Sequence, residues 1–376
     1  MIEHYIGLDV GQKKTAICII DKNGKKLQEG ACNTRPTEIY GWIKNRIEDL
    51  NSVRVGLEAG TMSSWITTEL LQCGVQTLCM ETFQAHRFLA TYRNKTDKND
   101  ARGLAQLLRM GGEDFVRVVA IKSAASQETR TMLNVRSHLV KERVQMENHI
   151  SGILKPYGVI VKRGVHGQSF RDNVELALSE LQGDRRSAFK ALILPLLDIY
   201  MQIFRRIAKL TTQIETIADN TPMVKRFMTI PGVGPITALS FYASVDYPER
   251  FRKSSDVGAY FGLTPKQFQS GESNFYGNIS KRGDPSTRQA LVQAATVLLY
   301  STNKWCSLKA WGVRLAKRIG YSKARVAVAR KLAIIMHKIW INETRYIPKK
   351  ISIEEIRALK DEQSNNTPHD MIMEAV

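Results

Sequence analysis

The 376-residue sequence has few cysteines and lacks long apolar runs. Its five cysteines are scattered, form no C-x-x-C pair and lie in no Cys/His cluster with the spacing of a zinc site. This pattern excludes the common zinc modules and suits a reducing cytoplasm. No apolar run approaches the ~20 residues of a membrane span, and the N-terminus follows a strand pattern rather than that of a signal peptide. We therefore expect a cytoplasmic protein without a membrane partner.

Acidic residues are also scarce relative to basic ones. The chain has 36 Asp and Glu against 55 Lys and Arg, a formal net charge of +19 and a pI of about 9.7. A surplus of this size favours a polyanionic partner, and nucleic acid is the leading candidate. The alternative is a basic protein whose charges are simply solvated. With 43% hydrophobic residues, the chain is long enough for two or three folded domains.

Residues 1–120 alternate between strand and helix patterns. Three β-type segments come first, and an Asn-Gly pair at positions 23 and 24 predicts a hairpin turn between the second and the third. Pro36 opens an amphipathic helix that is predicted to reach Leu50. The order β-β-β-α-β-α-β-α predicts an α/β domain with a mixed sheet. The expected strands are 4–10, 14–21, 25–34, 53–59 and 75–80, and a further helix is expected at 63–72.

Residues 121–221 have the pattern of long helices. Apolar residues recur at spacings of three and four, which is typical of coiled-coil-like seams. The Gly-rich, basic stretch 158–173 between the two seams is expected to be a linker. We expect an antiparallel hairpin or a dimerisation arm here, and a plain helical spacer is the open alternative. The seam residues are Met132, Val135, Leu139, Met146 and Ile153 in the first helix, and Tyr200, Ile203, Ile207, Leu210, Ile214 and Ile217 in the second.

Residues 222–345 are expected to form a mainly α-helical C-terminal domain, followed by a flexible tail at 346–376. The string IPGVGP resembles the turn of a helix-hairpin-helix, where backbone N–H groups at a helix N-terminus can hold a phosphate. An ordinary tight turn is the alternative. A polar loop or hairpin follows, and then a helix capped by Asp284 with Pro285 at its first position. Two basic helices are expected between 305 and 342.

Four acidic residues are placed where they could meet. Asp9 lies inside the first strand, Glu58 ends the fourth, and Asp97 and Asp100 stand one turn apart at the start of a helix. If the first and fourth strands are neighbours, the four carboxylates converge and repel one another unless cations neutralise them. Hard oxygen ligands suit Mg²⁺ or Mn²⁺, and two such ions can support phosphoryl transfer. The alternatives are a strand-end acid and two first-turn acids favoured by the helix dipole.

Five strings cover roughly residues 4–110 and 225–300: YIGLDVGQKKTAICIID, VGLEAG, TDKNDAR, IPGVGPITAL and QSGESNFYGNISKRGDPSTRQALVQAA. Together they resemble the DEDD-serine transposases of the IS110/IS1111 group of bacterial insertion sequences, whose relatives include the Piv-type DNA invertases. The resemblance implies an RNase H-like domain of the RuvC type over residues 1–120. In that domain, Asp9, Glu58, Asp97 and Asp100 correspond to the metal-binding acids.

The resemblance also implies a nucleophilic serine in the C-terminal domain. Ser270 in QSGES matches best, because it stands in an S-G pair ahead of an I-S-K-R-G segment and has cations nearby that could hold a phosphate. Ser273 and Ser280 are the alternatives, because Glu272 stands where the family usually has a small residue. The implied reaction is serine attack on a DNA phosphodiester, which gives a phosphoserine link.

Basic side chains that could contact phosphates flank these motifs and continue along the last two helices, where a solvated helix face is the alternative. No zinc finger and no convincing helix-turn-helix is present. The resemblance implies instead a noncoding guide RNA that pairs with donor and target DNA. Strand exchange implies a homo-oligomer, either a dimer or a tetramer. The candidate nucleic-acid contacts are Lys98, Lys266, Lys281, Arg282, Arg288, Arg314, Lys317, Arg318 and Arg325.

Two other functions compete with this interpretation. A RuvC-like, metal-dependent nuclease acting on DNA junctions would need the four acids but no serine. A basic architectural or RNA-binding protein with a degenerate site would need neither, although the presence of all four acids argues against degeneracy.

Overall fold

The computed structural model describes residues 1–111, 116–162, 167–181 and 183–348, together with the single residues 352, 354 and 357. Almost all of the expected tail at 346–376 lies outside these described residues. The chain divides into two compact units, Met1–Lys122 and Ser123–Val376. Each unit is described by itself.

The first unit is built on a five-stranded sheet with the order β3-β2-β1-β4-β5. The three N-terminal strands form an antiparallel meander, whereas β4 pairs parallel with β1 and β5 pairs parallel with β4. The expected mixed sheet is therefore confirmed, including the neighbouring positions of the first and fourth strands. The strands are β1 (His4–Val10), β2 (Lys14–Asp21), β3 (Lys26–Asn33), β4 (Val53–Glu58) and β5 (Gln76–Met80).

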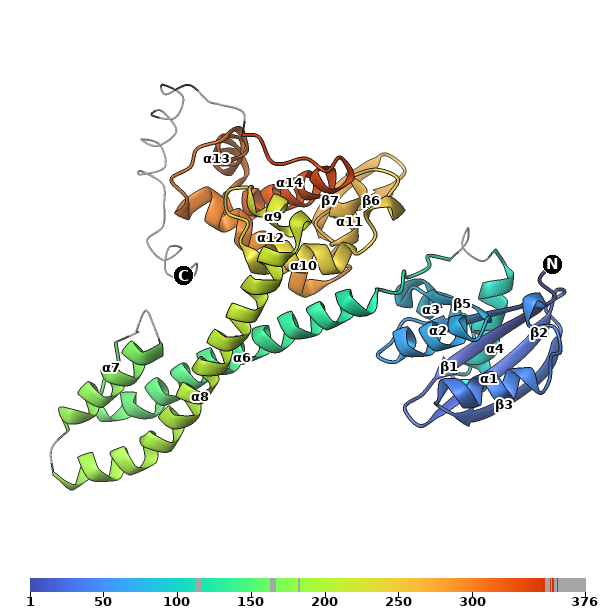
Figure 1. The fold of residues 1–376 in the computed structure, drawn as a ribbon, viewed down its shortest axis with the longest axis horizontal. Coiled ribbons are helices and arrows are strands. Elements are labelled where there is room, and N and C mark those ends of the chain that lie inside the picture. Colours follow the sequence, from blue (N-terminus) through green and yellow to red (C-terminus); the bar gives the residue numbers. More distant parts are fainter. Residues whose placement is uncertain are drawn as a thin grey trace. The chain divides into compact units, whose positions relative to one another are not determined.

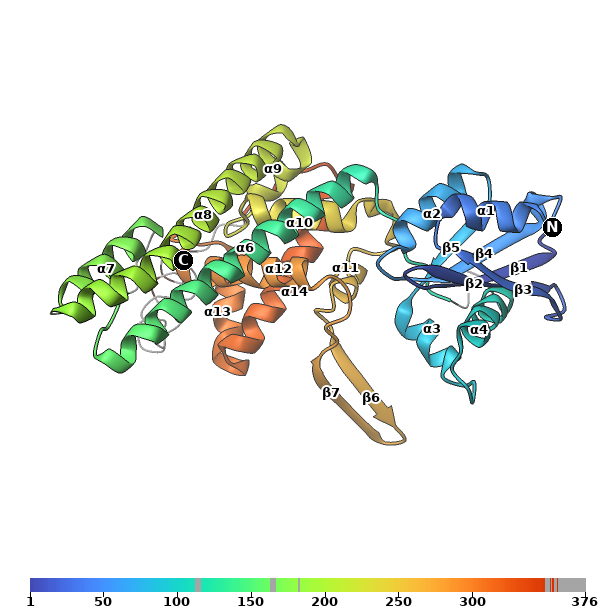
Figure 2. The ribbon, with the colours of Figure 1, turned by 90° about the horizontal axis from the view of Figure 1, so that it is seen from below.

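Helices cover both faces of this sheet, with α1 and α2 on one side and α3 and α4 on the other (Figure 2). Alternation along β1 explains the two faces, because Ile6 and Leu8 are buried in the same cluster as Ile39 of α1 and Ile66 of α2. The helix predicted to reach Leu50 ends earlier, and a 3-10 turn occupies Leu50–Ser52. The helices are α1 (Pro36–Lys44), α2 (Ser63–Gln72), α3 (Thr82–Leu89) and α4 (Asp97–Arg109).

The second unit begins with a long antiparallel helix pair, α6 (Ala124–Leu154) and α8 (Asp184–Asn220) (Figure 1). The direction follows from two hydrogen bonds. Arg136 Nε donates to Thr211 Oγ1 over 2.8 Å, and Tyr200 OH donates to Glu147 Oε1 over 2.9 Å. The expected antiparallel hairpin is thus confirmed for these two helices.

Two details of that pair differ from the prediction. In α6 the buried positions Leu133 and Leu154 fall one residue after the expected seam positions Met132 and Ile153, and Ile150 is buried although the expected seam did not include it. The expected linker 158–173 is partly wrong, because α7 begins inside it and spans Gly167–Ser179. Phe170 and Val174 of α7 are buried with Ile150 and Leu154, so the helix is part of a local core. Residues 163–166 of the expected linker lie outside the described residues.

The helix α8 contains a stretch, Arg186–Asn220, that is long and apolar enough to cross a membrane, with a mean hydropathy of 1.4 in its most apolar window. By this measure the expectation of no such run is wrong, because an averaged window tolerates the polar residues that interrupt an unbroken run. One such stretch is weak support for a membrane span, since core helices can have the same composition. Here Tyr200, Ile207 and Ile214 of α8 are buried within the second unit.

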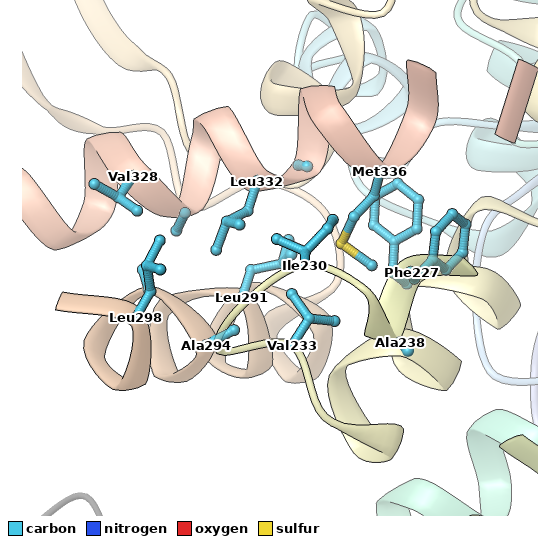
Figure 3. Close-up of a cluster of buried hydrophobic side chains, with 14 of the residues drawn as sticks. Phe227, Ile230, Val233, Ala238, Leu291, Ala294, Leu298, Val328, Leu332 and Met336 are labelled. Atoms are coloured by element: carbon cyan, nitrogen blue, oxygen red, sulfur yellow. The ribbon is translucent and has the colours of Figure 1, made fainter. Parts of the chain in front are cut away.

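The C-terminal half of the second unit packs helices around one large apolar cluster. Figure 3 shows Leu291 of α12 directed toward Leu332 of α14, and Leu298 of the π-helical turn Val297–Ser301 directed toward Val328 of α14. The expected helix start at Asp284 is confirmed, because its carboxylate accepts a hydrogen bond from Thr287 N over 2.9 Å. The elements are α9 (Pro222–Met228), α10 (Pro235–Val245), α11 (Asp256–Tyr260), β6 (Pro265–Ser270), β7 (Ser273–Ile279), α12 (Pro285–Thr296), α13 (Ser307–Ile319) and α14 (Tyr321–Ile341).

The PGVGP turn joins α9 to α10 and faces inward. Ile230 and Val233 on either side of its first glycine are buried, and their side chains point into the cluster (Figure 3). Gly232 has a φ of +87°, and a Cβ there would lie 2.6 Å from the carbonyl oxygen of Ala294. This glycine therefore serves the close approach of the turn to α12.

Candidate active site

Two parallel strands end side by side in the first unit and bring two carboxylates together. Leu8 of β1 pairs with Leu57 of β4, so Asp9 and Glu58 follow at equivalent positions of neighbouring strands. Both side chains are half-buried. Alternation places Asp9 on the same face as Gly7, which is the face covered by α4.

The helix α4 lies directly on the backbone of β1. A Cβ on Gly7 would lie 2.0 Å from the carbonyl oxygen of Ala101 and 2.5 Å from the amide nitrogen of Ala105. Only a residue without a side chain permits this approach. The preceding residue of the helix is Asp100, which is only 8% exposed, so the close packing holds its carboxylate near the ends of the two strands.

The start of α4 is defined by a threonine cap. Thr96 has an extended backbone, and its Oγ1 accepts a hydrogen bond from Asn99 N over 3.2 Å. Asp97 is therefore the first residue of the helix and is exposed, whereas Asp100 lies one turn later and is buried. Acidic residues are common in the first turn of a helix, because the positive end of the helix dipole attracts negative charge.

Electrostatics shows that the four acids form one group. Burial is the largest cause that raises the pKa of Asp9 from 3.8 to about 6, and the charges of Asp100, Asp97 and Glu58 raise it further. The nearby Lys95 acts in the opposite direction. A carboxyl whose pKa is raised by three other carboxylates lies within electrostatic range of all of them.

Glu58 has a raised pKa for similar reasons. Burial is the largest cause, and the charge of Asp100 adds to it, whereas His86 and Lys95 lower the pKa. His86 lies in the last turn of α3, after the strand β5 that neighbours β4. This histidine was not among the residues predicted for the site. Its position just beyond the next parallel strand was the signal that could have placed it at this edge.

The chemistry of these residues fits a divalent cation. Carboxylate oxygens are the ligands that Mg²⁺ and Mn²⁺ prefer, and a cation would remove the mutual repulsion that raises the pKa of Asp9. Among the residues that the structure describes, no three His, Cys, Asp or Glu side chains already stand in an arrangement that could hold an ion. Binding would therefore draw the carboxylates closer together. Lys98, a predicted nucleic-acid contact, is exposed and has its Nζ 3.9 Å from Glu29 Oε1.

The candidate serine lies at the tip of a β-hairpin in the second unit. Ser270 ends β6, Ser273 begins β7, and the turn between them consists of Gly271, with a φ of +54°, and Glu272. Both serines are exposed. The Ser273 hydroxyl donates to the Ser270 carbonyl oxygen over 3.0 Å, so Ser273 closes the turn. Ser280 lies at the base of the hairpin, where its amide donates to Thr264 O over 2.8 Å.

The base of the hairpin is tightly built and rich in cations. Gly283 has a φ of +83°, and a Cβ there would lie 1.9 Å from the carbonyl oxygen of Tyr260. Arg288 was predicted as a nucleic-acid contact, yet its Nη1 donates to the carbonyl oxygens of Phe261 at 3.1 Å and Arg282 at 3.3 Å. Its guanidinium therefore also holds this backbone in place. Lys281 has a φ of +55° and an exposed side chain.

The remaining predicted contacts fall on three separate elements of the second unit. Lys266 of β6 is exposed, as are Arg314, Lys317 and Arg318 of α13, whereas Arg325 of α14 is half-buried. The four acids belong to the first unit, and the candidate serines and all predicted nucleic-acid contacts except Lys98 belong to the second.

Comparison with known proteins gives two matches, the first of which continues past the end of the first unit at Lys122. Residues 6–159 match a family described as "Transposase" of the IS110 DEDD type, and residues 224–310 match the "Transposase IS116/IS110/IS902 family". The two matches span the carboxylate cluster and the serine hairpin, respectively.

Three curated relatives are similar along most of their length. The transposase for insertion sequence element IS1111A of Coxiella burnetii is 29% identical over 90% of this chain and 89% of that protein. A probable family 20 transposase of Pseudomonas aeruginosa is 28% identical over 91% and 98%. The pilin gene-inverting protein of Moraxella bovis is 22% identical over 93% and 99%. The chain belongs to the IS110 family of insertion-sequence transposases, which are enzymes that cut and rejoin DNA.

Proposed function

We propose that this transposase joins a serine nucleophile to a divalent-metal site made of Asp9, Glu58, Asp97 and Asp100. The observation that carries the proposal is the position of Asp9 and Glu58 at the ends of neighbouring parallel strands, beside the helix that begins with Asp97, where burial and the neighbouring carboxylates raise the pKa of Asp9 to about 6. Acids that repel one another in this way destabilise the fold, so they are best explained by a cation that they bind.

The strand order supports an RNase H-like domain of the RuvC type. An antiparallel meander β3-β2-β1 is extended by the parallel strands β4 and β5, and α4 lies across the central strand. In this arrangement the acids come from the two central strands and from the N-terminus of the covering helix. Such a site is open to a nucleic-acid backbone on the side of the exposed Asp97.

Asp9, Glu58, Asp97 and Asp100 would hold Mg²⁺ or Mn²⁺, and these ions stabilise negative charge on phosphate oxygens when bound. Lys95 lies close enough to lower the pKa of Asp9 and Glu58, so its ammonium could also contact a phosphate at this edge. Ser270 Oγ would attack the phosphorus and form a new P–O bond. The bond from phosphorus to the departing sugar oxygen breaks. The serine hydroxyl gives up its proton, and the sugar oxygen gains one to become a free hydroxyl.

We propose two nucleic-acid partners, namely DNA and a noncoding guide RNA. Donor and target DNA must both be held, and the net charge of +19 suits several phosphate backbones at once. The described residues contain no zinc finger that could read a DNA sequence, which is compatible with recognition through a noncoding guide RNA. We also propose a dimer or tetramer, in which the acids of one subunit work with the serine of another.

Covalent trapping tests the chemistry. Wild-type protein, Ser270→Ala and Asp97→Ala would each be incubated with the element's own end DNA, its flanking RNA and Mg²⁺, and then run on a denaturing gel. We expect a protein–DNA adduct only with the wild type. Cleavage that needs Asp97 but survives in Ser270→Ala without an adduct would replace the proposal by a RuvC-like nuclease.

Mixing experiments test the shared site. Ser270→Ala and Asp9→Ala proteins are each expected to be inactive alone and to regain cleavage when they are mixed, because a mixed oligomer contains one complete site. Mixtures that remain inactive, although both variants associate with wild-type subunits, would place the acids and the serine of one site in the same chain.

A further inference from the structure

The hairpin that carries Ser270 has no apolar core of its own. It extends away from the helices of its unit (Figure 2), and every residue of β6 and β7 is exposed except the half-buried Ile279. A two-stranded hairpin is marginally stable by itself, so its side chains should be mostly polar. Three of the thirteen strand residues are nevertheless aromatic, namely Phe268, Phe275 and Tyr276.

Two of these aromatics form an exposed stack. The rings of Phe268 and Phe275 have their centroids 5.0 Å apart and their planes within 16° of parallel. Phe268 is 48% exposed and Phe275 is 59% exposed, so large parts of both rings face water. Buried phenylalanines of this protein lie in its cores, as Phe227 and Phe241 do. The exposed pair therefore offers a flat apolar surface to a partner.

This stack lies on the same face of the hairpin as the candidate nucleophile. Phe268 pairs with Phe275, and Ser270 pairs with Ser273, so the four side chains occupy two successive positions on one face. Tyr276 pairs with Gln267 and lies on the opposite face. The distance from one position to the next on a face is about 6.7 Å along a strand.

A glycine makes room for the rings. A Cβ on Gly277 would lie 3.2 Å from Cε2 of Phe268, which is tighter than an ordinary contact. Gly277 follows Phe275 by two residues and so belongs to the same face. The absence of a side chain there lets the Phe268 ring lie over the strand and leaves the stack open to solvent.

The charge around the stack identifies the chemistry of the partner. Lys266 and Lys281 are exposed, and between residues 265 and 281 the only acid is Glu272 in the turn. A flat apolar surface with cations on its side toward the hairpin base fits a nucleotide, which combines a π face with a phosphate. The stack and Ser270 are about 6.7 Å apart along the strand. A base within a duplex has both faces covered by its neighbours, so a base that stacks on the rings must leave its normal stack.

We propose that Phe268 and Phe275 form a stacking platform for one unstacked base beside the phosphate that Ser270 attacks. The position of that phosphate rests on the proposed function, whereas the stacking itself does not. Phe268 and Phe275 are positioning residues in this proposal, because they would fix the strand and leave the chemistry to the serine and the acids.

Base fluorescence tests the platform without any cleavage. Single-stranded oligonucleotides with one 2-aminopurine would be titrated with the full-length Ser270→Ala protein, alone and combined with Phe268→Leu/Phe275→Leu or with Tyr276→Leu. Leucine keeps apolar bulk but removes the π face, and Tyr276 is the matched aromatic control on the other face. We expect quenching to disappear and binding to weaken about 5- to 150-fold in the double leucine variant, with no change in the control.

Three outcomes would overturn the platform: unchanged quenching in the double leucine variant, equal loss in Tyr276→Leu, or a change of oligomeric state on sedimentation in the double variant alone. The last would show that the rings meet another copy of the chain. If the proposed serine chemistry is wrong but the platform exists, wild-type protein forms no protein–DNA adduct, whereas the 2-aminopurine fluorescence is still quenched.

Discussion

Gly7 and Ala101 are so close that a Cβ on the glycine would lie 2.0 Å from the alanine carbonyl oxygen. This contact joins the central strand to the helix that begins with Asp97 and continues through Asp100. Since Asp9 follows Gly7 on the same face of the strand, one close approach sets the distance between the strand acids and the helix acids. The geometry of the carboxylate cluster is thus decided by a residue that bears no functional group.

Replacing Gly7 by alanine should disturb the cluster without touching an acid. The new methyl group must push α4 away from β1, and we expect a loss of about 1–3 kcal/mol in the free energy of unfolding. DNA cleavage should fall more than tenfold, because Asp100 moves with the helix. Gly41→Ala in α1 is the matched control, since nothing lies within 4 Å of its added Cβ. Gly7→Ala with unchanged stability and cleavage would show that α4 adapts freely.

Removing the charge of Asp9 should stabilise the metal-free fold at neutral pH. The pKa of Asp9 is about 6 in the folded chain against an ordinary value of 3.8, so the folded state binds more protons between these pH values. The free energy of unfolding therefore falls as the pH rises from about 4 to 6. In EDTA at pH 8, we expect Asp9→Asn to be more stable than wild type by about 1–2 kcal/mol after solvent screening.

Chemical denaturation across this pH range measures whether the free energy of unfolding falls as the pH rises. The advantage of Asp9→Asn should shrink as the pH is lowered and vanish near pH 4, where wild-type Asp9 is protonated. If the stability advantage of Asp9→Asn stays constant with pH, the pKa of Asp9 is not raised in the folded state.

Mg²⁺ should make the wild-type protein more stable than Asp9→Asn. A cation bound by the acids stabilises the folded state by linkage, so the melting temperature of wild-type protein should rise with Mg²⁺ concentration. Asp9→Asn and Asp100→Asn should lose most of that rise. Glu48→Gln, which removes an exposed acid elsewhere in the same unit, should keep it. A rise of equal size in all four proteins would point to nonspecific screening.

Local patterns predicted the elements that carry the four acids, because these elements follow short-range rules. Alternation along β1, the cap at Thr96 and the one-turn spacing of Asp97 and Asp100 are all readable within a few residues. The pairing of β1 with β4 is not local, but it follows from the order of the elements. His86 was missed because its approach to Glu58 depends on the path of α3 after β5, which no local pattern encodes.

The helical unit was harder to predict because its helices have several partners. Leu133 of α6 belongs to the cluster around Phe227, whereas Ile150 and Leu154 belong to the cluster around Phe170. A single seam cannot describe a helix that packs on different neighbours along its length. The helix α7 was taken for a linker because glycines and cations dominate the stretch before Phe170, although Phe170 and Val174 are spaced four apart.

The PGVGP turn offers a test between packing and phosphate binding. Gly232→Ala should destabilise the second unit by about 2–4 kcal/mol, because it combines a positive φ with a clash against Ala294. Gly234→Ala meets nothing within 4 Å and should fold normally. If Gly234→Ala also binds DNA like wild type, the turn acts through packing. If Gly234→Ala binds DNA more weakly than wild type but is equally stable, the turn binds phosphate, as its sequence suggested.

Substituting the two serines at the hairpin tip should distinguish the nucleophile from the residue that stabilises the turn. Ser273→Ala removes the hydrogen bond to the Ser270 carbonyl oxygen, which contributes about 0.5–1.5 kcal/mol to the turn. We therefore expect adduct formation to slow by less than about tenfold, whereas Ser270→Ala should abolish it. The rate of adduct formation under single-turnover conditions is the measurement.

A Ser273→Thr variant completes this comparison, because threonine keeps the hydroxyl and its hydrogen bond and should react at close to the wild-type rate. If Ser273→Ala abolishes the adduct and Ser270→Ala does not, the nucleophile is Ser273. The attacking oxygen would then lie across the hairpin from the position proposed here, still on the face that carries Phe268 and Phe275.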